Sequence, residues 1–245
     1  MDCREAAQRL KDVLGLSIPP VAVKFLKQGE QVPNGFPLAP KKMRFCQAVM
    51  EATWGRSISL PPTELACGPG PGTFGVPVKE KVAKGEVHHA FGLFESPEAA
   101  AKCLSANAKG LPGQFSMILV SPLEQCTIYP DVVVLRLNAE QAMWVCHSRS
   151  YKEGKHLVFD FQTEASVCSS IGMASYLKGE VQLGLGCYGS RSNTEMRADE
   201  LLVGIPGNLL ETTVEALEKL RKPMADSRAK RQFYEAYPEK RVAGA

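Results

Sequence analysis

The chain has 245 residues, of which 44% are hydrophobic and 22% charged, and its formal net charge is +3 at pH 7. A chain of this length buries a substantial core without disulfides, as one domain or as two paired halves. It contains no apolar run of about 18 residues, and its charged start does not resemble a secretory signal. We therefore expect a cytoplasmic protein with no membrane association, whose eight cysteines stay reduced.

Apolar periodicity and turn residues predict helices that alternate with strands. In the first part of the chain we expect a helix over 4–14 that ends at Gly15, a strand over 21–26, a helix over 45–53 and an extended segment over 57–60. Residues 67–75 are rich in Gly and Pro, so we expect neither helix nor central strand there. A strand over 90–93 and a helix near 97–108 complete this part.

The second part repeats this alternation. We expect strands over 116–121, 132–137, 181–185 and 202–205, an extended segment over 157–161, and helices over 140–148, 165–177 and 210–220. Such a pattern predicts a mixed fold of the α/β (α+β) class.

The same landmarks recur in the same order in both parts, which predicts an internal duplication. The strand after Pro20 matches the strand after Pro130, Cys46 matches Cys168, and Cys67 matches Cys187. The strand and helix over 90–99 match those over 202–220. We expect two pseudo-symmetric α/β halves packed around a shared seam, with an N-terminal helix over 1–17, a first half over 18–110, a second half over 111–220 and a basic C-terminal tail over 221–245.

The basic tail carries seven Lys and Arg residues against three Asp and Glu residues between positions 221 and 245. No groove-reading motif accompanies it, so we expect a solvated terminal helix and no nucleic-acid binding.

Four cysteines are candidate metal ligands because each copy of the repeat carries two. Cys46 and Cys168 lie near predicted helix starts, where free amide groups favour a thiolate. Cys67 and Cys187 leave strands and enter glycine-containing turns. The intervals do not match the compact spacing of ferredoxins or zinc ribbons, so tertiary structure must gather the four ligands. No catalytic residue is predicted.

A 4Fe-4S cluster between the halves is the interpretation we prefer, because amide groups near Gly68 and Gly189 suit cluster sulfurs. Arg191 would offset cluster charge or hold an anionic substrate. A tetrapyrrole or other small-molecule cofactor, a structural zinc ion, metal-free thiol chemistry and simple burial of the cysteines are the alternatives. We expect a redox partner protein or a small-molecule ligand. The pair His88 and His89 is expected at the surface, alternating across the strand over 90–93.

The chain also resembles a known family of archaeal and anaerobic bacterial proteins. Residues 183–191 (Leu-Gly-Leu-Gly-Cys-Tyr-Gly-Ser-Arg) and 199–206 (Asp-Glu-Leu-Leu-Val-Gly-Ile-Pro) are similar to the signature of the domain of unknown function 169 family. Supporting similarity lies in residues 46–68, 130–133, 140–142 and at Cys168, and the resemblance extends from about Ile18 to Leu220. It implies a cytoplasmic protein of anaerobic metabolism with recurring cysteines at the four candidate positions, and no particular reaction.

Overall fold

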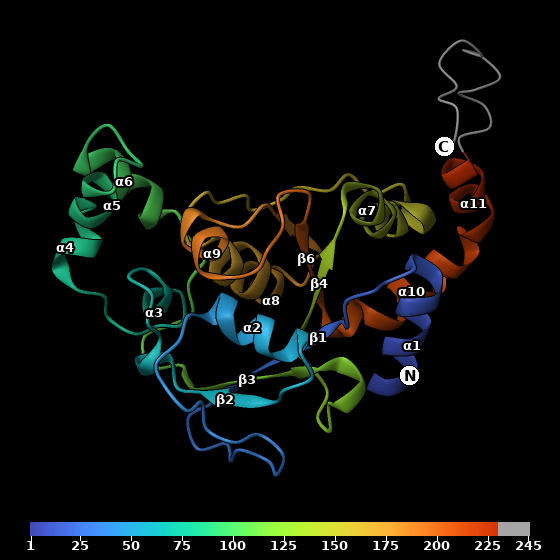
Figure 1. Cartoon of the computed structure of the whole chain (residues 1–245), viewed down its shortest axis with the longest axis horizontal. Helices are drawn as coiled ribbons and strands as arrows, with labels where there is room; N and C mark the ends of the chain where they lie inside the picture. The colour runs from blue at the N-terminus through green and yellow to red at the C-terminus, as the bar shows by residue number, and fades with distance from the viewer. Residues whose placement is uncertain (230–245) are drawn as a thin grey trace.

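A computed structural model of the chain describes residues 1–229, and these form helical layers on both faces of one six-stranded antiparallel sheet (Figure 1). The strand order is β2-β3-β1-β4-β6-β5. The mixed α and β fold class is therefore confirmed. The strands are β1 (Val21–Lys27), β2 (Ile58–Leu60), β3 (Phe115–Pro122), β4 (Val132–Leu137), β5 (Gln182–Gly184) and β6 (Leu201–Pro206).

The sheet consists of two sets of three strands with mirrored order. β1 and β4 meet antiparallel at the centre, with Val21 opposite Val134 and Val23 opposite Val132. β3 and then β2 lie outside β1, just as β6 and then β5 lie outside β4. This order agrees with the expected repeat, although a common origin of the halves stays a prediction. The strand order also groups β3 with the first set, whereas the predicted boundary after residue 110 places it in the second.

The strand predicted over 90–93 is wrong. Helix α5 (Glu86–Ala90) ends at this point, and residues 91–93 form a turn in which Phe91 is 65% exposed. The apolar residues over 90–93 therefore do not form a strand of the sheet. Together with α4 (Glu80–Ala83) and α6 (Pro97–Ser105), α5 forms a group at one end of the molecule, at the left of Figure 1. β3 is the strand that closes the first set.

One face of the sheet packs against the helices α1 (Cys3–Leu14), α7 (Ala139–Glu153) and α10 (Leu210–Lys219). Alternate strand residues such as Ala22, Val133 and Val203 point into this layer. The predicted stop of the first helix is confirmed, since Gly15 caps α1 with φ of 65°. Helix α11 (Arg221–Ala229) begins the predicted basic tail, of which residues 230–245 lie outside the described part of the chain.

The opposite face packs against α2 (Phe45–Thr53), the π-helix η3 (Val167–Ala174) and α8 (Ser175–Lys178). Val23, Phe25 and Val134 point into this layer. The ring of Phe74 lies 5.6 Å from that of Phe25 and 5.3 Å from that of Phe45, measured between centroids, so aromatic packing supports the first residues of α2 from below.

Two further expectations about local structure are wrong. Residues 67–75 contain a one-turn helix, α3 (Gly70–Thr73), because Pro71 lies in its first turn, where a helix needs no amide donor. Residues 157–161 form no strand. The remaining elements are α9 (Tyr188–Asn193) and the short 3-10 helices η1 (Pro62–Glu64), η2 (Leu123–Gln125) and η4 (Gly207–Leu209). None of the helices within residues 1–229 is long and apolar enough to cross a membrane.

Candidate cysteine centre

The four candidate cysteines lie at the beginnings of four helical segments. Cys46 is the second residue of α2 and Cys168 the second residue of η3, while Cys187 directly precedes α9 and Cys67 precedes α3 by two residues. Cys46 and Cys168 are each 5% exposed and Cys187 is 9% exposed. The helices α2 and α3 belong to the part of the chain that forms the first set of strands, and η3 and α9 to the part that forms the second. Residues far apart in sequence therefore supply the four thiols.

These thiols lie close enough together to act on one another electrostatically. Burial raises the pKa of Cys168 well above its usual range, and the neighbouring thiols of Cys67, Cys46 and Cys187 raise it further. Burial, Cys187 and Cys67 likewise raise the pKa of Cys46 to about 12. Burial is also the main cause of the raised pKa of Cys67. The four residues thus form one electrostatic cluster, which is called the cysteine centre below.

Glycines allow the backbone to approach this centre. A Cβ atom on Gly70 would lie 3.0 Å from Cβ of Cys67 and 3.8 Å from Sγ of Cys168. The Gly70 amide donates to the Cys67 sulfur and thereby lowers its pKa. A Cβ atom on Gly189 would lie 3.8 Å from Sγ of Cys187. A side chain at Gly70 would therefore crowd Cys67, whereas the 3.8 Å approaches to Cys168 and Cys187 are ordinary van der Waals contacts.

Arg44 is the cation of the centre, and it was not predicted from the sequence. Its Nη1 donates to Sγ of Cys67 at 3.6 Å, and its positive charge lowers the pKa values of Cys46, Cys67 and Cys168. The start of α2 fixes it, because the Arg44 amide donates to Oε1 of Gln47 at 2.9 Å. The one sequence feature that could have indicated this role is its position two residues before Cys46.

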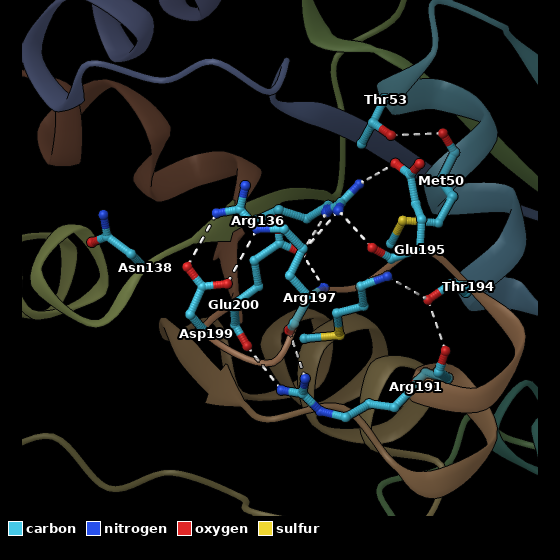
Figure 2. A network of polar contacts seen from close by, with 12 residues as sticks. Met50, Thr53, Arg136, Asn138, Arg191, Thr194, Glu195, Arg197, Asp199 and Glu200 are labelled. Carbon is cyan, nitrogen blue, oxygen red and sulfur yellow. Dashed lines mark hydrogen bonds and ion pairs between the residues drawn. The ribbon is translucent and has the colours of Figure 1, made fainter.

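Arg191, predicted to face the cluster or an anion, instead binds main-chain carbonyl groups. Its Nε, Nη1 and Nη2 donate to the carbonyl oxygens of Leu185, Arg197 and Glu200 at 2.8, 2.7 and 2.9 Å. Figure 2 shows the side chain extended beneath the loop that follows α9. The arginine fixes the chain on both sides of Cys187.

An ion-pair network, buried at Arg136 and Glu200, continues from this loop to the sheet (Figure 2). The side chain of Arg136 on β4 is 4% exposed, and it contacts Glu200 at 2.8 Å and Glu195 at 2.9 Å. Glu195 also accepts from Nε1 of Trp54, just after α2, at 3.0 Å. The network therefore links β4, the residue that follows α2, and the loop after α9.

A cavity of about 200 Å³ lies beside the cysteine centre. Cys67 and Cys187 line it together with Gly68 and Gly189, the two glycines predicted to bind a cofactor. His88 and Glu164 also line the cavity, and neither was predicted from the sequence to belong to the site. The remaining lining residues are Arg44, Pro69, Val87, Phe91, Leu93, Ala165, Tyr188 and Asn193.

The expectation that His88 and His89 alternate across a strand is wrong for both, and the expected surface position is wrong for His88. Both residues belong to α5, where His88 is 5% exposed and faces Glu164, while His89 is exposed. Helical geometry turns adjacent residues onto different faces, so only one of the pair reaches the interior.

The cysteine centre is not a preformed cage for one ion. Among residues 1–229, no three His, Cys, Asp or Glu side chains are arranged to hold a single metal ion. Tetrahedral zinc, with Zn–S bonds of about 2.3 Å, would require sulfurs about 3.8 Å apart. What the structure provides is four neighbouring thiols, one arginine and an adjoining cavity.

Comparison with known proteins gives a family but no activity. A family model for DUF169, described as "Uncharacterised ArCR", matches residues 9–216. An uncharacterised protein of Methanocaldococcus jannaschii is 28% identical over 223 residues, which cover 90% of this chain and 95% of that protein. No solved structure matches. The chain therefore belongs to the domain of unknown function 169 family.

Proposed function

We propose that this protein is a cytoplasmic iron–sulfur protein of anaerobic metabolism. Cys46, Cys67, Cys168 and Cys187 would hold a 4Fe-4S cluster, in a role in electron transfer or in cluster-dependent redox chemistry. The observation that carries the proposal is the convergence of four thiols from four separate segments into one electrostatic cluster.

The chemistry of the donor set fits such a group. Four thiolates are the usual ligands of iron–sulfur clusters, and an amide donor to a ligating sulfur, as Gly70 supplies to Cys67, tunes the reduction potential. When bound, a cluster supplies one-electron redox chemistry. Arg44 offsets part of the negative charge that four thiolates bring together.

Metal loading would change the protonation of the centre. Burial and mutual proximity raise the pKa values of Cys46, Cys67 and Cys168, so these thiols are protonated at neutral pH without a cofactor. Metal ligation requires thiolates, so loading must release these protons. Arg44 lowers the cost of that release because it favours the thiolate form of all three residues.

A cysteine series tests the proposal. The protein is produced and purified without oxygen, as wild type, Cys168→Ser and Cys146→Ser. Cys146 is the matched control, since it is a half-buried cysteine on α7, which covers the opposite face of the sheet. We expect iron, acid-labile sulfide and brown colour in the wild type and Cys146→Ser, and their loss from Cys168→Ser.

Other results would contradict the proposal in distinguishable ways. Zinc without sulfide would make the centre a structural zinc site. A tetrapyrrole spectrum that survives Cys168→Ser would make it a cofactor-binding module. A folded wild type with neither iron nor sulfide would exclude the cluster.

A further inference from the structure

The cavity beside the cysteine centre contains a buried acid and a buried base. The side chains of His88 and Glu164 are 6% and 9% exposed, and Nε2 of His88 lies 3.6 Å from Oε2 of Glu164. This separation exceeds hydrogen-bond length, and Nδ1 of His88 is buried without a partner. Within the described residues, the 3.6 Å approach to His88 is the one polar contact recorded for the Glu164 carboxyl group.

Such a pair is costly for the fold. A buried polar group without a partner destabilises a protein, because it has lost its hydrogen bonds to water and gained none in return. Burial raises the pKa of Glu164 to about 7 and lowers that of His88, so near pH 7 the imidazole is neutral and the carboxyl group is about half protonated. Both groups can then donate a hydrogen bond to a ligand oxygen.

The backbone beside Glu164 is strained as well. Ala165 lines the same cavity and has φ of 53°, and it is the one residue other than glycine with positive φ within residues 1–229. Backbone strain of this kind is destabilising and concentrates at functional sites. The positive φ of Ala165 turns the chain between Glu164, which faces the cavity, and η3, which carries Cys168.

Arg44 gives the cavity a cation without a carboxylate partner. Among the residues that the structure describes, its guanidinium group contacts no Asp or Glu. It donates a hydrogen bond to Sγ of Cys67. Guanidinium groups bind carboxylates through two parallel hydrogen bonds. The cavity is also lined by apolar side chains, namely Val87, Phe91 and Leu93.

We propose that this cavity is the binding site for a small oxo-carboxylate with an apolar side chain. Arg44 would hold the carboxylate, the protonated carboxyl group of Glu164 would donate to the oxo oxygen, and the apolar wall would cover the hydrocarbon part. A volume of about 200 Å³ limits the ligand to a small metabolite. The inference rests on the proposed function, since Cys67 and Cys187 would present a cluster to the bound molecule.

The test uses two acids that differ only in the oxo group, ketoisocaproate and isocaproate. Binding to oxygen-free protein is measured by calorimetry, and iron is assayed in the same samples. We expect the wild type to bind ketoisocaproate about fivefold more tightly than isocaproate, because one neutral hydrogen-bonding interaction is gained. Glu164→Leu should remove this preference and leave isocaproate binding intact.

Arg44→Gln should weaken the binding of both acids about tenfold or more, because it removes a charge-assisted contact. Arg56→Gln is the matched control, since Arg56 is exposed and pairs with Glu51. Thermal unfolding verifies that each variant is folded. Loss of affinity in the control, or a preference that survives Glu164→Leu, overturns the assignment of the residues.

The iron assay separates the two proposals. Protein that contains the cluster but binds neither acid refutes the carboxylate site alone. Iron-free protein that binds ketoisocaproate with the expected preference supports the carboxylate site and refutes the proposed cluster.

Discussion

Replacing Glu164 by Gln should make the protein more stable at neutral pH. The side chain is 9% exposed and lacks a hydrogen-bond donor at normal distance, and burial raises its pKa from 4.5 to about 7. Ionised Glu164 is therefore disfavoured in the folded chain. Glutamine has nearly the same shape and never ionises, so the variant isolates the contribution of the charge.

The sign follows from proton linkage. Between pH 4.5 and 7 the unfolded chain loses the Glu164 proton while the folded chain keeps it, so the wild type loses stability as pH rises through this interval. A pKa difference of about 2.5, at 1.36 kcal/mol per pH unit, gives at most about 3.4 kcal/mol. Most of this difference, about 2.5 kcal/mol, develops between pH 5 and pH 8.

Urea unfolding at pH 5, 6, 7 and 8 measures the effect as the difference in unfolding free energy between Glu164→Gln and wild type. We expect the advantage of the variant to grow by about 2.5 kcal/mol across the series. The exposed Glu86, replaced by Gln, is the matched control and should show no such trend. A difference that does not change with pH would refute the conclusion that the folded chain keeps this carboxyl protonated.

Three further predictions follow from other contacts. Arg136→Met should lower the unfolding free energy by about 3 kcal/mol in urea titrations, because the buried Glu200 loses its partner; a loss below about 1 kcal/mol would contradict this role. Gly189→Ala should lower the iron content of the purified protein, because its methyl group would lie 2.9 Å from Nη1 of Arg44; unchanged iron would show that Arg44 moves freely. Cys126 should be alkylated by iodoacetamide well below pH 8, because the neighbouring Cys3 thiol lowers its pKa; peptide mass spectrometry that finds it unlabelled at pH 7 would contradict the pairing.

Elements with strong local signals could be predicted from the sequence. Periodic apolar residues and a terminal glycine define α1, and the helix predicted over 45–53 coincides with α2. The apolar run over residues 132–135 of β4 matches its position beside β1, with side chains buried on both faces. The four cysteines could be chosen because they recur with the landmarks of each half, and the structure brings them together.

The rest depends on tertiary contacts that leave no local pattern. Residues 90–93 have the composition of a strand, yet no neighbouring strand is available there and α5 ends instead. His88 and Glu164 are 76 positions apart, so nothing local indicates that they face each other. Arg44 and Arg191 both lie near cysteines in sequence, and only the fold shows which one contacts a thiol.

Iron and acid-labile sulfide per chain, measured on wild-type protein prepared entirely without oxygen, test the cysteine centre most directly. We expect about four iron and four sulfide per chain, as a cluster with four cysteine ligands requires. A correctly folded, colourless protein that contains neither would contradict the assignment of Cys46, Cys67, Cys168 and Cys187 as ligands of one cluster.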